Sequence, residues 1–483
     1  MERGLAADLS RFSDLRDLVH NIYKEIYMAR NSLDQDLRGY LETNADILTT
    51  IKKPVQLDDI GALSAQSEGP ILFENIIGYP GYRLCDMLVK RRWSQCRALG
   101  VEEHEFLPML AQRLRKGPRP LVDVKSGPVK EVILSGKEAD WLKLPIPRHS
   151  ELETEPYVTA MNIVKDPETG FYNSSHAGTQ AIEPHRGLIS FITPHTHQII
   201  QKYLDLGKEE MPIALVFGIP PAFEIMGNFS GLHMDLWGEM EMVGTIMDID
   251  IEMVPCETID LTVPAHAEII VEATVDLKSR TKIGVGVSPS MYYLPKEAAL
   301  PDLHVMAITM RKDRPIYRNH QTTPDTDHQT LPRLCHEAVL YNRLTEIGVK
   351  VHDVQFPTWG GALSCIVQVE APREGFINDA LMQAMGAPWL NTKMVVAISP
   401  DTDISQPGEV YHAIASRCDP ARDIVIVDHT RGSPFDPSAT PIDAFWRTVG
   451  KIGIDATAKL RNREDHERSW PVNWGKIKLQ DYL

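Results

Sequence analysis

Residues 266–275 read His-Ala-Glu-Ile-Ile-Val-Glu-Ala-Thr-Val, and this stretch indicates the character of the middle of the chain. Its polar positions Glu268, Glu272 and Thr274 alternate with apolar residues. That period is typical of a β-strand with one face in a core and the other toward solvent. We therefore expect a half-buried strand here, with the two glutamates on its outer face.

Several short β-prone runs separated by turn residues surround this strand. They cover residues 129–134, 157–164, 188–193 and 213–219. Runs of this length at this spacing are typical of an all-β sandwich or barrel. The sequence therefore predicts a β-rich middle domain, such as a barrel, over residues 121–310.

The two ends of the chain contain helical patterns in addition to strand patterns. Near the N-terminus, Ser13 can cap a helix in which apolar residues recur at helical spacing from Leu15 to Ile26. After about Asp325, helical and strand patterns alternate, which indicates a layered α/β domain. The expected helices are 331–347, 377–385 and 409–417, and the expected strands are 362–370, 394–398 and 423–428.

These patterns predict a multidomain α/β protein. We expect an N-terminal α/β domain over residues 1–120, the central barrel over 121–310, a C-terminal α/β domain over 311–455 and a tail over 456–483. The tail contains Trp470 and Trp474, which suit either an oligomer contact or docking on the parent domain.

Composition narrows the class of protein. The 483 residues are 43% hydrophobic and 24% charged, an ordinary globular balance. A net charge of −16 argues against a nucleic-acid partner, because nothing would neutralise the phosphates. No run of 18 apolar residues and no apolar N-terminal signal are present, so we expect no membrane segment. The six scattered cysteines lack any Cys-x-x-Cys pair, which favours reduced thiols and a cytoplasmic location.

The common dinucleotide, phosphate-loop, zinc-protease and serine-hydrolase signatures are missing. Several other blocks, in order along nearly the whole chain, instead resemble the signatures of UbiD-type decarboxylases. They are Pro70–Gly81, Leu144–His149, Pro156–Thr159, Lys165–Gly170, Pro212–Pro221, Val254–Pro264 and Ile452–Lys459.

This resemblance implies that the central barrel is a split β-barrel. It also implies a prenylated FMN cofactor in this barrel, with its phosphate held through a divalent metal (Mn²⁺ or Fe²⁺) and K⁺. The family's metal ligands, an Asn, a His and a Glu, fall on Asn173, His195 and Glu239. Hard cations with oxygen-rich ligands suit the task because they offset phosphate charge. The resemblance also aligns Lys393 with a lysine that reaches the flavin phosphate.

Each assignment has an alternative in the residues themselves. Asn173 follows a turn and suits an ordinary turn asparagine. His197 competes with His195, and Glu241 competes with Glu239. Lys393 suits equally a lysine that faces solvent at the start of a strand.

Most characterised family members place a Glu-Arg-Glu triad beside the flavin. At the aligned positions this chain has Gly178 for the arginine, and Ile283 and Ser288 for the glutamates. Because the carbon that loses carbon dioxide must then be protonated, another group has to act as general acid. His176 is our candidate, and its alternative is a loop histidine facing solvent. Arg280 and Lys282, near the missing glutamates, suit either the binding of a carboxylate or other anionic substrate or an ordinary solvated loop.

The resemblance therefore implies a carboxy-lyase acting on an aromatic acid. Loss of the triad resembles the phthaloyl-CoA decarboxylase branch, so our preferred substrate is an aromatic diacid CoA thioester such as phthaloyl-CoA. The alternatives are a free aromatic or acrylic acid, or a non-catalytic or assembly-dependent subunit of a carboxylase complex. Expected partners are a flavin prenyltransferase and further copies of the chain, as a dimer or hexamer.

Overall fold

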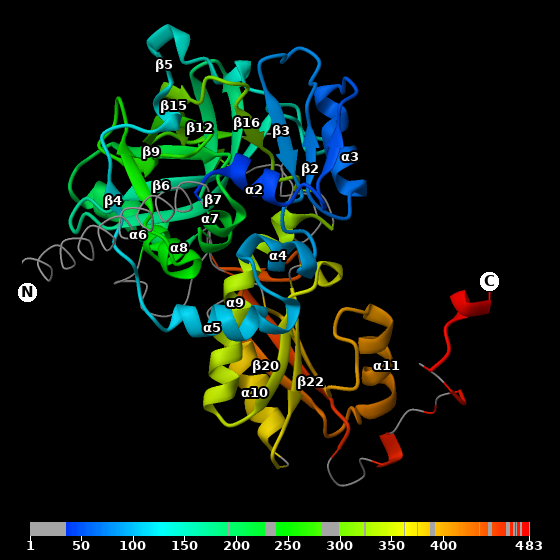
Figure 1. Cartoon of the computed structure of the whole chain (residues 1–483). Coiled ribbons are helices and arrows are strands. Elements are labelled where there is room, and N and C mark those ends of the chain that lie inside the picture. The colour runs from blue at the N-terminus through cyan, green and yellow to red at the C-terminus, as the bar shows by residue number, and fades with distance from the viewer. Residues whose placement is uncertain are drawn as a thin grey trace, which may run out of the picture. The chain divides into compact units, whose positions relative to one another are not determined.

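The computed structural model describes residues 35–482 except 192, 228–237, 283–298, 323–324, 362, 374, 387–391, 434, 443–446, 460–463, 467–468, 470 and 474–475. The helix expected near Ser13, and Trp470 and Trp474, lie outside the described residues, as do Ile283 and Ser288. The chain divides into two compact units (Figure 1). Unit 1 comprises residues 1–339 and 434–437, and unit 2 comprises 340–433 and 438–483. The predicted boundaries at 120, 310 and 455 stay predictions.

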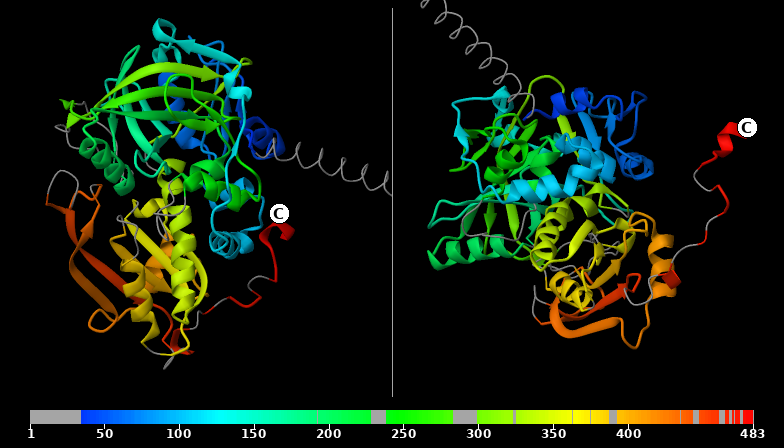
Figure 2. Two further views of the ribbon diagram at one scale, coloured as in Figure 1. Left: turned by 90° about the vertical axis from the view of Figure 1, so that its left-hand side faces the viewer. Right: turned by 60° about the horizontal axis from the view of Figure 1, so that its bottom comes forward.

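Unit 1 is built around a closed barrel of six strands. In spatial order these are β12 (Ile269–Asp276), β9 (Glu210–Phe217), β6 (Tyr157–Lys165), β7 (Tyr172–Glu183), β8 (Arg186–Ser190) and β15 (Asp302–Met310). Pairing of β12 with β15 closes the circle, and every neighbouring pair in the barrel is antiparallel. The green strands in Figure 2 show this barrel from two further directions. The predicted split barrel is confirmed.

The prediction that Glu268 and Glu272 face solvent is wrong, because both are fully buried. Glu268 accepts hydrogen bonds from Arg38 at 2.8 Å and from Ile316 N at 3.0 Å. Glu272 accepts from the backbone N–H groups of Glu257 and Thr258. A buried carboxylate is tolerated when such donors satisfy it. The polar and apolar residues alternate along this strand, but both of its faces are buried.

The other sheets and helices of unit 1 pack around this barrel. A four-stranded sheet joins β1 (Thr49–Ile51), β2 (Ile71–Phe73), β3 (Arg83–Asp86) and β16 (Ile316–Arg318), and a three-stranded sheet joins β11 (Thr262–Pro264), β10 (Glu252–Pro255) and β4 (Val122–Asp123). The strand β5 (Val132–Ser135) adds to β15. The helices are α2 (Leu37–Thr43), α3 (Ile60–Gln66), α4 (Arg92–Leu99), α5 (Phe106–Leu114), α6 (Pro194–Asp205), α7 (Pro221–Met226) and α8 (Glu239–Met247).

One apolar cluster runs from the barrel into the four-stranded sheet. Trp141 lies fully buried in it and donates from Nε1 to the carbonyl of Glu183 at 2.8 Å. Gly187 on β8 leaves the room that this ring needs, since a Cβ there would lie 2.4 Å from Trp141 Cη2. This cluster fixes the barrel strands that carry the candidate site.

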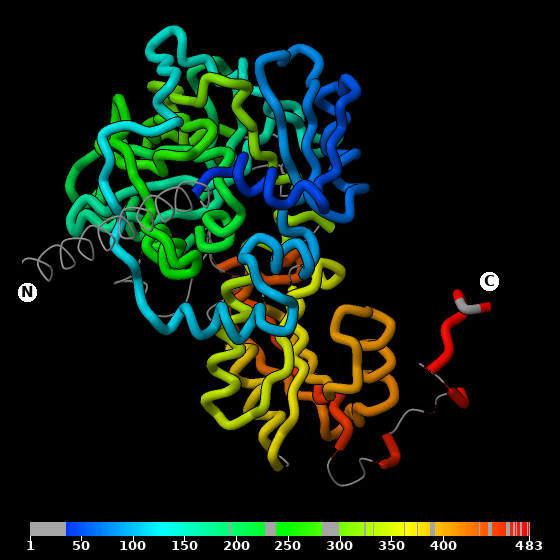
Figure 3. The backbone as a smooth tube through the Cα atoms, viewed as in Figure 1, coloured from blue at the N-terminus to red at the C-terminus, as the bar shows by residue number. Residues whose placement is uncertain are grey.

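The tube in Figure 3 can be followed from β16 into α9 (Asp327–Glu346), the helix in which the chain passes from unit 1 to unit 2. The sheet of unit 2 has the order β17 (Lys350–Gln355), β18 (Ser364–Glu370), β19 (Met394–Ile398), β22 (Arg447–Ala456) and β20 (Ile424–Gly432), and β21 (Thr440–Pro441) pairs with β22. The strands β18, β19 and β22 are parallel.

Two helices cover opposite faces of this sheet (Figure 1). A Cβ at Gly453 on β22 would meet Leu381 of α10 (Phe376–Met385). The next residue, Ile454, clusters with Val410 of α11 (Pro407–Arg417). Successive strand residues point to opposite faces, so the two helices sandwich β22. The layered α/β prediction for the C-terminal region is confirmed.

Within the part of the chain that the structure describes, no helix combines the length and apolarity that crossing a bilayer requires.

The signature at Ile452–Lys459 has a structural explanation in unit 2. Lys459 Nζ lies 2.8 Å from Asp455 Oδ2 and 3.4 Å from Asp423 Oδ2, and it also donates to the carbonyl of Asp455 at 3.0 Å. Asp455 is the penultimate residue of β22, and Asp423 directly precedes β20. The lysine therefore ties together the adjoining ends of two neighbouring strands.

We expect Lys459→Met to lower the free energy of unfolding of unit 2 by about 3 kcal/mol, because two largely buried carboxylates lose their cation. Lys350→Met is the matched control, since its pair with Glu370 is exposed and contributes about 1 kcal/mol or less. Urea titration with hydrogen exchange at β22 measures both. Equal effects of the two substitutions would contradict this account.

Candidate functional site

The start of β7 is held between two helices. Asn173, the second residue of β7, is buried, and its Nδ2 donates to Thr196 Oγ1 in the first turn of α6 at 3.3 Å. The next backbone N–H, of Ser174, donates to Glu239 Oε2 at 2.9 Å. Glu239 is the first residue of α8. These contacts bring Asn173 and Glu239 together and place His195, the neighbour of Thr196, on the same turn of α6.

The alternatives at the histidine and glutamate positions behave differently. The ring of His197 lies 3.1 Å from the carbonyl of Phe191, to which a protonated Nε2 can donate. Glu241 is partly buried in the first turn of α8, and its Oε2 is a buried atom without a hydrogen-bond partner in the described part of the chain. Its neighbour Gly238 leaves room for it, since a Cβ there would lie 2.0 Å from that oxygen.

The electrostatics at Glu239 leave a place for a cation. Burial raises the pKa of Glu239 to about 8, and the charge of Glu241 adds to this effect. No ion pair joins Glu239 to a lysine or arginine in the part that the structure describes. Nor do three His, Cys, Asp or Glu side chains converge there as in a zinc site. An amide oxygen, an imidazole and a buried carboxylate without a protein cation fit a hard divalent ion.

Lys393 lies in unit 2, directly before β19, and donates from Nζ to Ser438 Oγ. The three metal-ligand candidates lie in unit 1. Hydrogen bonds therefore connect Asn173 and the start of β7 with Glu239 and with the first turn of α6. For Lys393, the structure gives only the contact with Ser438 inside unit 2.

Tyr157 fills the space above Gly178, the position where the family arginine falls. A Cβ at Gly178 would lie 2.0 Å from Tyr157 Oη and 2.8 Å from its Cζ. Tyr157 is buried on β6 and meets the His149 ring edge to face, with centroids 5.5 Å apart. Position 178 therefore has no room for any side chain while Tyr157 keeps this place.

Three buried histidines surround this position. The rings of His176 and His320 meet edge to face with centroids 5.0 Å apart. His149 lies with Nε2 at 3.0 Å from Asn319 Oδ1 and Nδ1 at 3.1 Å from Thr322 Oγ1. Asn319 Oδ1 only accepts, so His149 carries its proton on Nε2. Burial lowers the pKa of His149 to about 3. The candidate His176 is thus a buried residue, and the solvent-facing alternative is wrong for it.

The residues that sequence reasoning missed form a cluster around Arg318, at the end of β16. Its guanidinium contacts Glu224 at 3.1 Å, Asp86 at 3.2 Å and Asp327 at 2.6 Å, and all four side chains are buried. Because β3 and β16 are parallel, Asp86 and Arg318 end at the same edge. No motif signals this cluster, since its members come from four elements separated by up to 241 positions.

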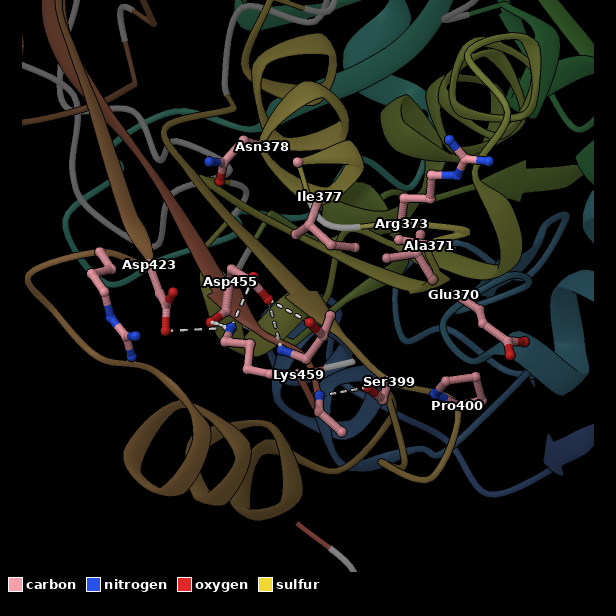
Figure 4. A pocket seen from close by; sticks show the side chains of 15 residues that line it. Glu370, Ala371, Arg373, Ile377, Asn378, Ser399, Pro400, Asp423, Asp455 and Lys459 are labelled. Atoms are coloured by element: carbon pink, nitrogen blue, oxygen red, sulfur yellow. Dashed lines mark hydrogen bonds and ion pairs between the residues drawn. The ribbon is translucent and has the colours of Figure 1, made fainter. Parts of the chain in front are cut away.

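Unit 2 contains a second feature, a cavity of about 190 Å³ at the carboxyl ends of β18, β19 and β22 (Figure 4). Glu370, Ser399 and Thr457 mark these three ends in its wall. Figure 4 shows Lys459 joined to Asp455 and Asp423 on one side of the cavity, so its charge is already offset. Lys393 precedes β19 and belongs to the amino end of the same sheet.

Comparison with known proteins places the chain among decarboxylases. A family model described as the Rift-related domain of 3-octaprenyl-4-hydroxybenzoate carboxy-lyase matches residues 121–324, and a model of the C-terminal domain of that carboxy-lyase matches 329–456. The anhydromevalonate phosphate decarboxylase of Methanosarcina mazei is 30% identical over 442 residues, which cover 90% of this chain and 98% of the relative.

Two solved structures of HmfF, a UbiD-class enzyme of Pelotomaculum thermopropionicum, share the fold. The complex with FMN has a TM-score of 0.82 and 31% identity, covering 92% of this chain and 100% of the other. An evolved dimeric form in complex with prenylated FMN has a TM-score of 0.80 and 29% identity, covering 93% and 100%.

The contact between Tyr157 and Gly178 makes a stability prediction. We expect Gly178→Ala to lower the free energy of unfolding by about 1–3 kcal/mol, because the added methyl overlaps Tyr157. In a Tyr157→Ala background the same change should cost almost nothing. Gly81→Ala is the control, since a Cβ there meets nothing within 4 Å. A penalty that is the same with and without Tyr157 would disprove the overlap.

His149 makes a pH prediction. It stays neutral in the folded protein, whereas in the unfolded chain it titrates near its ordinary pKa of about 6.5. The unfolded chain therefore binds more protons below that pH, and the stability that His149 contributes falls as the pH falls from 6.5 toward 3. Between pH 7 and pH 5 the wild type should lose about 2 kcal/mol relative to His149→Gln. Parallel thermal denaturation curves of both proteins measure this, and a gap that does not narrow on acidification would contradict it.

Proposed function

Because this chain belongs to the UbiD family of decarboxylases, we propose that it uses prenylated FMN to remove carbon dioxide from an unsaturated acid without net oxidation. The observation that carries the proposal is the pair of hydrogen bonds from Asn173 to Thr196 and from Ser174 N to Glu239. These bonds place the amide of Asn173, the helical turn that carries His195 and the carboxylate of Glu239 at the start of β7. The HmfF structures, which hold FMN and prenylated FMN, support it.

In this proposal, Asn173, His195 and Glu239 hold a divalent ion, Mn²⁺ or Fe²⁺, and with K⁺ and Lys393 they bind the flavin phosphate. The cofactor supplies an electron sink for the bond that breaks. The chain's own residues hold the phosphate, shield the site from water and deliver a proton. Ionisation of Glu239, which burial opposes, becomes favourable once a cation offsets its charge.

The proposed substrate class follows from position 178. With Tyr157 over Gly178, no arginine can stand where the family places one. A substrate whose own carbonyl withdraws electrons from the ring depends less on such a charge. We therefore keep an aromatic diacid CoA thioester such as phthaloyl-CoA as the first candidate. The basic run Arg113–Arg119 is a candidate to bind the phosphates of coenzyme A, but Arg119 is already paired with Asp248 and Asp250.

A second candidate is anhydromevalonate phosphate, since a relative of that activity matches 90% of the chain at 30% identity. A free aromatic or acrylic acid, or a role as an assembly-dependent subunit, are the remaining alternatives.

We propose a flavin prenyltransferase as the source of the cofactor and a homo-oligomer as the working form. The dimeric form of HmfF supports the latter. None of the six cysteines forms a disulfide, which suits the cytoplasmic location that we propose.

Substrate assays decide between these candidates. The chain, co-expressed with a flavin prenyltransferase, is assayed for carbon dioxide release from phthaloyl-CoA, anhydromevalonate phosphate and free aromatic and acrylic acids. We expect turnover of the thioester. Turnover of the phosphate alone would replace the first candidate by the second, and a flavin-loaded protein inert to all would favour the assembly-dependent subunit.

Glu239→Gln tests the metal site itself. We expect at least a tenfold loss of bound divalent metal, because the only fully buried carboxylate of the proposed set is gone. Bound flavin should fall with the metal. Glu241→Gln is the matched control, two residues along the same helix, and should keep both. Metal analysis and the flavin absorption spectrum give the result, and loss in the Glu241 variant alone would reassign the ligand.

A further inference from the structure

The Arg318 cluster holds more negative charge than its cation offsets. Three buried carboxylates, of Asp86, Glu224 and Asp327, surround one guanidinium. The nearby cation Lys90 is taken up by the carbonyls of Ala65 and Ser67. Uncompensated charge in a dry interior is costly, so such clusters bind protons instead. The excess of buried acid therefore favours the binding of a proton in this cluster.

The geometry of His320 indicates where one proton lies. Its Nδ1 is 2.6 Å from the carbonyl of Thr159, which only accepts, so Nδ1 carries a hydrogen. Its Nε2 is 3.1 Å from Glu224 Oε1. A neutral ring would then point a lone pair at a carboxylate. A shared proton, on the imidazole or on the carboxyl, removes this repulsion. In the described structure the two atoms lie within ion-pair distance but without the alignment of a hydrogen bond.

This pair lies directly behind the position where the triad is missing. Thr159, which accepts from His320 Nδ1 and donates back to the His320 carbonyl at 2.8 Å, is the β6 partner of Gly178. The His176 ring, on β7 two residues before Gly178, packs edge to face on His320. Two independent contacts thus connect the proton-holding pair to the strand that carries the candidate site.

We propose that Glu224 and His320 store the proton that decarboxylation consumes, and that His176 carries it to the substrate carbon. This inference rests on the proposed function. The carboxylate leaves as carbon dioxide, and the electron pair of the broken carbon–carbon bond stays with the substrate. The Glu224–His320 pair first passes its proton to the neutral His176 ring. The resulting imidazolium gives this proton to that carbon, keeps the N–H electrons and returns to its neutral form. Solvent then restores the proton of the pair, so one proton is consumed per carbon dioxide.

The groups around the pair explain why the proton rests there. Burial lowers the pKa of His176 well below its ordinary value, and the positive charge of Arg318 acts in the same direction. Burial raises the pKa of Glu224 above its ordinary value, against the charges of Arg318 and His176. The other groups that interact with this pair are Cys85 from β3, Tyr40 from α2, and Asp327 and His328 from α9. Burial, together with the charge of Arg318, also lowers the pKa of His320 well below its ordinary value. His176 is therefore neutral at rest, and its charged form is a strong, short-lived acid.

The stored proton can be tested without knowing the substrate. In infrared difference spectra of wild type and Glu224→Gln at pH 7, a proton on Glu224 appears as a carboxylic acid band that shifts in D₂O and is lost in the variant. A proton on His320 instead appears as an imidazolium signal in ¹⁵N-histidine NMR spectra, again lost in the variant. Either signal supports the proposal. Spectra that show neither, from protein of unchanged melting temperature, would overturn it.

The kinetic arm uses a matched control. Glu337→Gln makes the same change at a buried glutamate that is paired with Arg92 at 2.8 Å. We expect Glu224→Gln to lower kcat about 100-fold with KM nearly unchanged and to flatten the pH profile of kcat. Glu337→Gln should stay within about twofold of wild type. Equal losses in both variants, or none in Glu224→Gln, would refute the proposal. If the wild type releases no carbon dioxide from any substrate, the proposed function fails. The spectra still show whether Glu224 or His320 carries a proton.

Discussion

A carboxylate buried without a protein cation is the constraint on which the candidate site depends. Glu239 accepts the N–H of Ser174 and so fixes the first turn of α8 against the start of β7. Burial raises the pKa of Glu239 to about 8, so the ionised carboxylate is electrostatically unfavourable in the absence of a cation. A bound divalent ion reverses that cost. Metal binding, ionisation of Glu239 and the ordering of this strand end are then linked in one equilibrium.

Unit 1 contains two electrostatic defects, both with an excess of buried acid. Glu239 has no ion pair with a lysine or arginine in the described part of the chain, and around Arg318 three carboxylates face one guanidinium. The first defect suits an ion, and the second suits a proton. In our account the chemistry uses both, because the metal anchors the cofactor phosphate and the proton completes the product. At position 178, where the family resemblance implies an arginine, this chain has a glycine, and Tyr157 fills the space above it.

Local pattern predicted much of the fold. The strand expected at 157–164 is β6 at Tyr157–Lys165, and the one at 394–398 is β19 without change. These strands are buried runs of β-prone residues, so propensity and tertiary structure agree. Pattern failed at Glu268 and Glu272, because their partners decide their burial. Arg38, the partner of Glu268, lies 230 positions away, and no periodicity in residues 266–275 reveals it.

The same limit applies to the site. Asn173, His195 and Glu239 were found through a resemblance, since each has an ordinary alternative by itself. Glu239 accepts a backbone hydrogen bond from Ser174, whereas Glu241 keeps a buried oxygen without a hydrogen-bond partner in the described part, so the choice between them stays a prediction. Glu224, Arg318 and His320 gave no signal at all, because a buried charge cluster assembled from distant elements has no local spacing. In the sequence, Tyr157 belongs to a β-prone run and to the Pro156–Thr159 block, and neither reveals that its side chain covers a glycine of the neighbouring strand.

The central claim is that a divalent ion binds at the start of β7. Anomalous diffraction at the manganese and iron edges, from crystals of protein made together with a flavin prenyltransferase, tests this most directly. The account predicts one peak bonded to Asn173, His195 and Glu239, with flavin phosphate density beside it. A flavin bound with no peak there, or a peak held by His197 and Glu241, would contradict it.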